Sequence, residues 1–311
     1  MESNTTIYDL ICIGAGPAGL SAAIYAARAG LNVLVLEQGG EGGKLLSTHL
    51  IENWPGTVSI TGADLAKNMA AHAREVGAEI TWAVVEGILD AEAETKEVKC
   101  LGTSYFARSI LVASGCQERH LGIPGEEEFR GQGVSYCAVC DGAFFQDCEI
   151  VVIGSGDSAF EEGDYLTRYG KKVTLLLRSE RVHADRVYIE RAEANPKMEV
   201  FKNRVVEEII GSPATGVEKI RIHNVEDDSH YELECQAVFP FIGSVPNTKF
   251  LSDLSILDKQ GFIEAQADMS TSIPGVYAAG DCRQKVLRQV ITAGNDGAIA
   301  AQSIAAYLRS R

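Results

Sequence analysis

The sequence predicts an α/β fold in which two three-layer domains of sheet, sheet and helix (ββα) share one chain of 311 residues, the second inserted into the first. Three observations predict this fold. An apolar strand near the N-terminus runs into a glycine-rich turn that begins at Gly14 and then into an alanine-rich helix. The same pattern of strand, turn and helix recurs later in the chain, with Gly154 in the place of Gly14. Near the C-terminus, a short apolar strand ends in Gly280 and Asp281 ahead of another alanine-rich helix, which returns the chain to the first domain.

The first glycine-rich turn, GAGPAG, has the sequence context of a dinucleotide-binding site. Gly14 permits the tight turn, Gly16 lets a pyrophosphate approach the backbone, and Gly19 lets the helix pack on the sheet. A second strand follows the helix and ends in Glu37. At this distance beyond Gly19, the carboxylate is placed to accept a hydrogen bond from the ribose of an adenosine. The segment therefore predicts a Rossmann-like site for FAD or NAD.

The second turn keeps the spacing of the first, with Gly154, Gly156 and Ala159 in the three positions. It differs where ribose is recognised, because Leu177 replaces the carboxylate and Arg178 follows. A guanidinium in place of a carboxylate favours a 2′-phosphate over a bare hydroxyl. We therefore expect NADPH at the second site. Two such sites on one chain indicate electron transfer between two dinucleotides.

The segment SYCAVCDGAFF contains a closely spaced pair of cysteines, Cys137 and Cys140, with Asp141 next to it. Three interpretations are open at this point: a redox disulfide, half of a metal site, or two buried thiols. Of the eight cysteines, only these two are closely spaced, and the sequence has no His-x-x-x-His partner for them. A structural zinc site is therefore disfavoured, and no metal is expected.

Composition excludes several classes of function. The 43 acidic and 28 basic residues give a formal net charge of −15, so nucleic acid is not an expected partner, because phosphate binding needs a basic face. No segment approaches the roughly 18 uninterrupted apolar residues of a membrane helix. The N-terminus lacks the basic start and apolar core of a signal peptide. We expect a cytoplasmic protein that does not bind a membrane.

Segments along nearly the whole chain resemble the low-molecular-weight (bacterial-type) thioredoxin reductases, which are FAD-dependent pyridine nucleotide-disulfide oxidoreductases. In family order they are GAGPAGLSAAIYAARAG, IENWPG, ASGCQERHLGIPGE, CAVCDGAFF, GSGDSAFEE, FIGSVPNT, GVYAAGDC and LRQVITAGNDGAIAA. The resemblance implies a thioredoxin-disulfide reductase that passes electrons from NADPH through FAD and the cysteine pair to thioredoxin or a thioredoxin-like protein. It implies that Cys140 faces the flavin, that Cys137 attacks the partner's disulfide, and that Asp141 supplies or removes the proton.

The resemblance also implies a domain organisation. An FAD-binding domain would comprise residues 1–116 and 247–311, and an NAD(P)H-binding domain with the dithiol would comprise residues 117–246. Members of the family are homodimers with non-covalent FAD. They rotate the second domain, because the nicotinamide and the disulfide cannot both touch the flavin at once. His49 is expected to be a loop residue near FAD.

Cofactor contacts follow from the resemblance residue by residue. The residues expected to bind FAD are Gly14, Gly16, Pro17, Ala18, Gly19, Glu37, Gln38, Gly43, Lys44, Leu45, Asn53, Ala113, Ser114, Gly115, Gly280, Asp281, Arg288, Gln289 and Val290. The residues expected to bind NADPH are Gly154, Gly156, Asp157, Ser158, Ala159, Arg178 and Arg181.

Departures from the family pattern leave alternatives open. The family's phosphate-reading run is His-Arg-Arg with another Arg four residues beyond, and here only Arg178 is in register. Leu177 and Ser179 flank it, and His183 takes the last position, so NADH is an alternative donor. The fold also occurs in ferredoxin-dependent flavoproteins and dithiol oxidases, and a flavin-loaded sensor is the alternative outside catalysis. Lys44 stands where the family has Gln, and it points either toward the cofactor or toward solvent.

Overall fold

The computed structural model describes residues 6–48 and 50–311, which form two compact units. The discontinuous unit comprises Met1–Gln117 and Val245–Arg311, and the inserted unit comprises Glu118–Ser244. The loop expected at His49 lies outside the described residues. Within the described residues, no helix combines the length and the apolar character that crossing a membrane requires.

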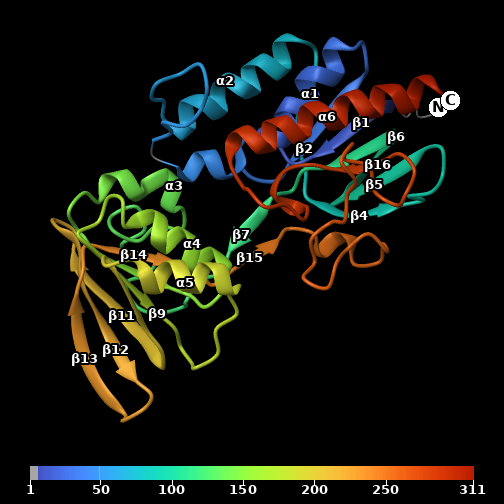
Figure 1. Ribbon diagram of the computed structural model, residues 1–311. Helices are drawn as coiled ribbons and strands as arrows, with labels where there is room; N and C mark the ends of the chain where they lie inside the picture. Colours follow the sequence, from blue (N-terminus) through green and yellow to red (C-terminus); the bar gives the residue numbers. More distant parts are fainter. Residues whose placement is uncertain (1–5, 49) are drawn as a thin grey trace. The chain divides into compact units, whose positions relative to one another are not determined.

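The discontinuous unit is built on a parallel sheet that continues into an antiparallel one (Figure 1). The hydrogen-bonded order is β3-β2-β1-β6-β5-β4, and β16 also pairs with β6. These strands are β1 (Ile7–Ile13), β2 (Val33–Glu37), β3 (Glu79–Trp82), β4 (Val85–Leu89), β5 (Lys96–Cys100), β6 (Thr103–Val112) and β16 (Val276–Ala278). On the edge away from β1, strand β6 pairs first with antiparallel β5 and then with parallel β16, so it belongs to both sheet layers.

Helices cover one face of the parallel sheet in this unit (Figure 1). They are α1 (Pro17–Arg28), α2 (Gly62–Glu75) and α6 (Val290–Arg309), with short 3₁₀ helices at Gly43–Ser47, Lys249–Leu251 and Gly280–Cys282. In β1, Leu10 and Cys12 pack beneath the helices, whereas Ile11 and Ile13 belong to the core on the opposite face. Because both faces are buried, the strand is apolar at successive positions rather than at alternate ones.

The C-terminal helix α6 packs directly on α1. A Cβ at Gly297 of α6 would lie 2.1 Å from the carbonyl oxygen of Ala18 in α1, so the helices approach more closely than any side chain at that position would allow. Alanines on both helices, among them Ala22 and Ala301, are fully buried in the same core. The last helix of the chain therefore completes the layer that the first helix begins.

The segment between β16 and α6 is fixed by a buried carboxylate. Asp296 Oδ2 accepts hydrogen bonds from Gly280 N at 3.1 Å, Arg283 Nε at 3.1 Å and Lys285 Nζ at 2.8 Å. The side chains of Asp296 and Lys285 are 5% and 7% exposed. A buried charge is tolerated when it is paired and hydrogen-bonded. The three contacts thus hold the end of β16 against α6.

The inserted unit has the same three layers. Its parallel sheet has the order β10-β9-β8-β14, and its antiparallel sheet has the order β11-β12-β13. The strands are β8 (Glu149–Ile153), β9 (Lys172–Leu176), β10 (Met198–Phe201), β11 (Arg204–Ser212), β12 (Gly216–Asn224), β13 (Ser229–Glu234) and β14 (Ala237–Pro240). The helices are α3 (Ala138–Asp141), α4 (Asp157–Leu166) and α5 (Arg186–Ala194), with a 3₁₀ helix at Gly142–Phe144. Val152 and Phe160 belong to the core under the helices, and Val151 and Ile220 to the core between the sheets.

The two units share strand order and register. Leu10 of β1 pairs with Val33 of β2, and Ile150 of β8 pairs with Val173 of β9. Both members of the second pair follow those of the first by the same interval along the chain that separates Gly14 from Gly154. The predicted fold class, two Rossmann-like domains with the second inserted into the first, is confirmed.

The chain passes between the units twice, at β7 (Cys116–Glu118) and β15 (Ser244–Pro246), and these two strands pair with each other. Asn247 N donates to the carbonyl oxygen of Gly115 at 3.0 Å, and Arg119 N donates to that of Gly243 at 2.9 Å. Both glycines have positive φ, 72° and 101°, a conformation that glycine adopts without strain. The connection is therefore a short two-stranded ribbon flanked by glycines.

Candidate functional site

The glycines of the first predicted dinucleotide site meet different demands. At Gly14, where φ is 109°, a Cβ would lie 2.4 Å from the carbonyl oxygen of Ala113 at the end of β6. At Gly19 it would lie 1.9 Å from the carbonyl oxygen of Gly14. At Gly16 it would meet nothing within 4 Å. The fold itself therefore requires glycine at positions 14 and 19, whereas Gly16 leaves open space beside the backbone.

Helix α1 begins at this open space. Its N-cap is Gly16, which makes no side-chain capping hydrogen bond, and Pro17 follows in the first turn. The N–H groups at the start of a helix lack partners within the helix and attract anions. The backbone around Gly16 can therefore hold a phosphate group without any clash with a side chain of its own.

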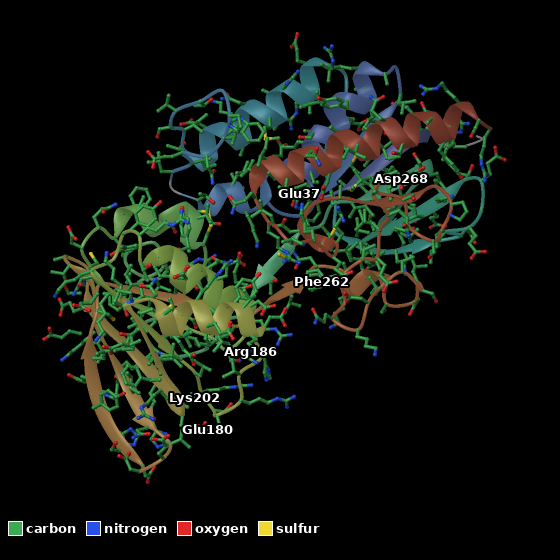
Figure 2. All side chains as sticks on the ribbon, in the orientation of Figure 1. Glu37, Glu180, Arg186, Lys202, Phe262 and Asp268 are labelled. Atoms are coloured by element: carbon green, nitrogen blue, oxygen red, sulfur yellow. A yellow bond between two sulfur atoms is a disulfide. The ribbon has the colours of Figure 1, made fainter. Side chains whose placement is uncertain are left out.

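The carboxylate of Glu37 lies beside the turn, at the end of β2 (Figure 2). Its Oε2 accepts a hydrogen bond from Ala15 N at 2.7 Å, and its Oε1 accepts one from Gly39 N at 2.7 Å. Hydrogen bonds to an ionised carboxylate are stronger than those between two neutral groups. Two backbone amides thus orient the side chain that the sequence assigns to ribose recognition.

The residues predicted to bind FAD gather at one edge of the parallel sheet. Strands β1, β2, β6 and β16 end at or just before Gly14, Glu37, Ala113 and Gly280. Parallel strands present their carboxyl ends at a common edge, where ligands bind in such sheets. The other predicted residues follow these strand ends or open the nearby helices: Pro17, Ala18, Gly19, Gln38, Gly43, Lys44, Leu45, Ser114, Gly115, Asp281, Arg288, Gln289 and Val290.

Two further contacts support a binding site at this edge. Asn53 Nδ2 donates to Gln289 Oε1 at 3.1 Å, which ties the loop after the first 3₁₀ helix to the start of α6. The guanidinium of Arg288 lies 4.7 Å from the ring centroid of Phe262. The buried Nε of Arg288 has no hydrogen-bond partner among the described residues. An unpaired buried donor is costly, so an acceptor supplied by a ligand fits this position.

Lys44 lies in the 3₁₀ helix that adjoins the first turn, where a Cβ at Gly43 would come within 3.3 Å of Gly16 Cα. The exposed Lys44 side chain donates from Nζ to Cys116 Sγ at 3.4 Å. Burial raises the pKa of the Cys116 thiol, and the positive charge of Lys44 opposes that shift. Lys44 therefore has a specific partner within the unit, which answers in part the question that the sequence leaves open.

The second turn has the same division of roles. A Cβ at Gly154 would lie 2.4 Å from the carbonyl oxygen of Phe241 and 2.7 Å from Ala159 Cβ. At Gly156 it would meet nothing within 4 Å. Gly156 is the N-cap of α4 and makes no side-chain capping hydrogen bond. The inserted unit therefore leaves open space beside the middle glycine, just as the first site does.

The loop after β9, residues 177–185, is fastened to the second turn. His183 N donates to the carbonyl oxygen of Ser155 at 2.7 Å, and Asp185 N donates to Asp157 Oδ1 at 2.7 Å. Leu177 is fully buried, whereas Arg178, Arg181 and the predicted contact Ser158 are exposed. The position equivalent to Glu37 is thus apolar and buried, and the guanidinium groups extend from the loop that follows it.

Cys137 and Cys140 form a disulfide with a Cα–Cα distance of 5.3 Å. Of the three interpretations, the redox disulfide is the one consistent with this bond. Ser135 Oγ donates to Asp141 Oδ2 at 2.6 Å and accepts from Cys137 N at 3.2 Å. A buried serine thus contacts both the Asp141 carboxylate and the backbone of Cys137.

Comparison with known proteins identifies the family. Residues 8–297 match the family described as pyridine nucleotide-disulphide oxidoreductase. The chain belongs to this family. It is 44% identical to a thioredoxin reductase of Listeria innocua serovar 6a, over 99% of this chain and 96% of the relative. It is 42% identical to a thioredoxin reductase of Bacillus subtilis strain 168, over 98% of this chain and 96% of the relative.

A solved structure of similar sequence supports the same assignment. The crystal structure of thioredoxin reductase from Streptococcus pyogenes MGAS5005 is 42% identical and superposes with a TM-score of 0.92, covering 99% of this chain and all of that one. Within the family, the chain is of the low-molecular-weight thioredoxin reductase type. The family and the enzyme class predicted from the sequence are confirmed.

One functional candidate in the inserted unit, Glu162, is not anticipated by the sequence. It lies on α4, and its Oε2 accepts a hydrogen bond from Ala138 N at 3.2 Å, between the two disulfide cysteines. Burial raises the pKa of the Glu162 carboxyl to about 7, and the hydrogen bond from Ala138 opposes the shift. The adjacent Glu161 is exposed. The sequence alone does not distinguish these two neighbouring glutamates, because they differ only in their burial. Helix α4 thus adjoins both the second turn and the disulfide.

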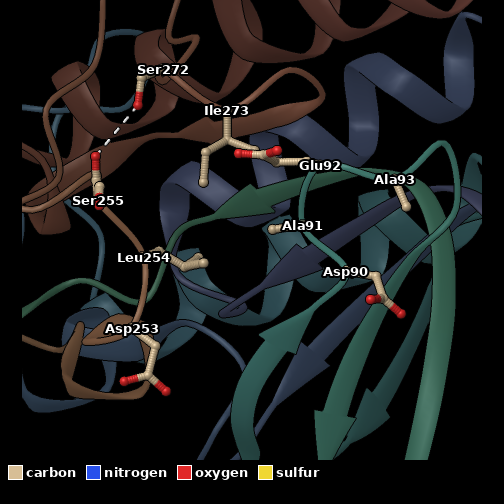
Figure 3. Close-up of a pocket in the computed structure, with 9 residues that line it drawn as sticks. All are labelled: Asp90, Ala91, Glu92, Ala93, Asp253, Leu254, Ser255, Ser272 and Ile273. Carbon is tan, nitrogen blue, oxygen red and sulfur yellow. Dashed lines mark hydrogen bonds between the residues drawn. The ribbon is translucent and has the colours of Figure 1, made fainter.

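The discontinuous unit also has a pocket, whose lining includes none of these groups (Figure 3). It has a volume of about 500 Å³, and its lining residues are Asp90, Ala91, Glu92, Ala93, Asp253, Leu254, Ser255, Ser272 and Ile273. Ser272 Oγ donates across it to the carbonyl oxygen of Ser255 at 3.5 Å. None of these residues belongs to a predicted cofactor site, so the pocket adds nothing to the redox assignment.

We predict that Glu162→Gln makes the stability of the protein less dependent on pH. The pKa of Glu162 is raised from its ordinary value of 4.5 to about 7, so the native state binds this proton more tightly than the unfolded chain does. The resulting stabilisation is complete below about pH 4.5 and is lost as pH rises through about 7. Between pH 5 and 8 the wild type should lose about 1–3 kcal/mol that the variant retains.

Urea unfolding of the whole chain at several pH values from 5 to 8 measures this difference. The matched control is Glu161→Gln, which removes the neighbouring exposed carboxylate. The same pH profile for Glu162→Gln and wild type would contradict the assignment.

Proposed function

We propose that the protein reduces the disulfide of thioredoxin or a thioredoxin-like protein, with electrons that enter from NADPH and pass through FAD to the Cys137–Cys140 disulfide. The observation that carries this proposal is the presence, in one chain of this family, of one disulfide and of two glycine-rich turns that leave open space at Gly16 and Gly156, called here the two cradles. We further propose that residues 1–116 and 247–311 bind FAD and that residues 117–246 bind NADPH.

The residues of the discontinuous unit fit FAD. Open space at Gly16 and the uncapped start of α1 suit the pyrophosphate, and Glu37 is oriented for the adenosine ribose. The buried Nε of Arg288 is available to an acceptor on the cofactor. When bound, FAD supplies the chemistry that links a two-electron hydride donor to a disulfide.

The residues of the inserted unit fit a dinucleotide with a 2′-phosphate. Open space at Gly156 suits the pyrophosphate. Leu177 stands at the position equivalent to Glu37, so no carboxylate is there to repel an additional phosphate. Arg178 and Arg181 are exposed on the loop that is hydrogen-bonded to the turn. Guanidinium groups form strong paired hydrogen bonds with phosphate. NADPH is therefore the donor that we propose, with NADH as the alternative.

Once it is reduced, the pair of Cys137 and Cys140 carries out thiol–disulfide exchange with the partner protein. Two electrons and two protons convert the Cys137–Cys140 disulfide to two thiols. The Cys137 thiolate attacks the partner's disulfide and forms a mixed disulfide, and the Cys140 thiolate then displaces the partner and restores the original bond. The partner leaves with both its sulfurs reduced. Asp141, held by Ser135 Oγ, is placed to move a proton to or from these thiols.

The state of the remaining cysteines bears on the compartment of the protein. Six cysteines in the described residues are free, and five of these are buried. Free thiols together with one redox disulfide suit a reducing compartment. We therefore propose a cytoplasmic protein, and we propose from the resemblance to the family alone that it is a homodimer.

The first test is replacement of Cys140 by serine. Cys140→Ser should lower thioredoxin-dependent disulfide reduction by at least 100-fold, because the mixed disulfide cannot be resolved, while NADPH still bleaches the flavin absorbance anaerobically. The control Cys148→Ser changes a free thiol of the same unit and should have little effect. Full activity of Cys140→Ser would overturn the proposal. Flavin absorbance that is bleached only by reduced ferredoxin would show that the electron donor is not NADPH.

The second test separates the two cofactor sites. Gly16→Ala should leave the fold intact, because φ is −75° and the new methyl meets nothing, but should lower FAD affinity at least tenfold. Gly156→Ala, with φ of −100°, should leave FAD content unchanged and raise the KM for NADPH. Flavin absorbance per chain and steady-state kinetics measure both. Gly19→Ala is the contrasting variant and should impair folding itself, because its methyl would overlap the backbone.

The third test concerns the choice between NADPH and NADH. Arg178→Ala should raise the KM for NADPH by about 10-fold or more, the loss expected for one charge-assisted hydrogen bond, and leave the KM for NADH unchanged. Arg186→Ala is the control. Arg186 is exposed on the inserted unit (Figure 2), and its guanidinium pairs with Glu190. An equal change for both nucleotides would show that Arg178 does not contact the 2′-phosphate.

A further inference from the structure

We propose that the β12–β13 hairpin of the inserted unit carries a surface site for a transition-metal dication such as Zn²⁺, with His223, Asp228 and His230 as ligands. The residues lie on the antiparallel sheet (β11, β12 and β13 in Figure 1), and none belongs to either cradle or to the disulfide segment. The sequence predicts no metal, because it contains no second closely spaced pair of cysteines and no His-x-x-x-His partner for Cys137 and Cys140.

The strand register places the two imidazoles opposite each other. His223 of β12 pairs with His230 of β13, and their rings are stacked with centroids 4.6 Å apart and an interplanar angle of 10°. Asp228, in the turn between the strands, places Oδ1 2.8 Å from His223 Nε2. One ligand atom from each of the three residues lies within 4.8 Å of the others.

These distances can close around a metal by side-chain rotation alone. Ligands at the usual zinc distance of about 2.0 Å are about 3.3 Å apart in a tetrahedral site. The side chains of Asp228 and His230 are 91% and 52% exposed, so they can rotate without displacing neighbours. The backbone positions of the two histidines are already fixed by the ladder. Two imidazoles and a carboxylate, with water as the fourth ligand, form a donor set that suits zinc.

Glu207 provides an outer partner for this site. Its Oε2 lies 2.9 Å from His230 Nδ1, so a proton on Nδ1 directs the lone pair of the neutral ring to Nε2. A carboxylate behind a histidine in this way orients the ring and increases its basicity at many metal sites. Glu207 lies where the register of β11 against β12 shifts between Val206 and Glu208. Such bulges re-aim side chains, and here the carboxylate is brought to the histidine.

The neighbouring pairs of facing residues, or rungs, in the β12–β13 hairpin differ in kind from the pair of His223 and His230. Arg221 is opposite Glu232, and Lys219 is opposite Glu234, so each of these rungs joins opposite charges. Opposite charges in facing positions stabilise a sheet. The rung of His223 and His230 joins two potential metal ligands instead, with carboxylates on either side. A bound dication would add a positive charge beside these carboxylates, so this rung would also join opposite charges.

Isothermal titration of the intact FAD-loaded protein with ZnCl₂ tests the site. The disulfide is kept oxidised, because reduced Cys137 and Cys140 would bind zinc themselves. We expect one saturable site, at least tenfold weaker in His223→Gln and in His230→Gln, and weakened to a smaller extent in Glu207→Gln. His120→Gln, which alters another exposed histidine next to a carboxylate, is the matched control and should bind as wild type does.

A measurement on the unaltered protein keeps the proposal testable if a variant does not fold. Zinc should protect His223 and His230, but not His120, from acylation by diethylpyrocarbonate, as read by peptide mass spectrometry. Absence of saturable binding at millimolar zinc, or binding that His230→Gln leaves unchanged, would overturn the proposal. Neither result depends on the redox activity, so the proposed function stands or falls separately.

Discussion

In each unit, the turn after the first parallel strand passes so close to the end of a neighbouring strand that no side chain fits between them. Gly14 meets the carbonyl oxygen of Ala113 in this way, and Gly154 meets that of Phe241. This close approach sets where the following helix begins, and so it places the N–H groups of that helix at the carboxyl edge of the sheet. The open space at the start of each helix therefore results from the packing of the fold itself. The middle glycine alone, Gly16 or Gly156, is spared a structural role and can serve a ligand.

The discontinuous unit also depends on a second close approach, between its first and last helices. Gly297 of α6 packs against the Ala18 carbonyl of α1, while Asp296 binds the backbone at Gly280 and the buried charge of Lys285. One turn of α6 thus contacts both the helix that starts at the cradle and the strand end that completes the edge. This arrangement explains why the chain must return to its first domain, since neither end of the chain alone can form the complete carboxyl edge of the parallel sheet.

The sequence alone predicts those features that depend on local geometry. The glycine spacing predicts both glycine-rich turns, with Gly154 in the place of Gly14. The structure adds that β1–β2 and β8–β9 share a register. Features that arise from tertiary packing cannot be predicted in this way. Glu162 differs from Glu161 only because one side of α4 packs against the disulfide segment. The pairing of His223 with His230 depends on the strand register and on a turn whose geometry the letters do not reveal.

The two units differ at the position that Glu37 occupies in the first and Leu177 in the second, and the difference has a physical cause on each side. Glu37 remains at the surface edge because the amides of Ala15 and Gly39 stabilise its charge. Leu177 is instead buried, with its N–H bonded to Phe201 and its carbonyl to Arg204. The residues after Leu177 must therefore leave the core at once, and the loop that they form is drawn back to the cradle through the amides of residues 183 and 185. In the second unit, a buried leucine thus stands in place of the glutamate, and exposed arginines follow it on the loop. This exchange of negative for positive charge suits a ligand with an additional phosphate.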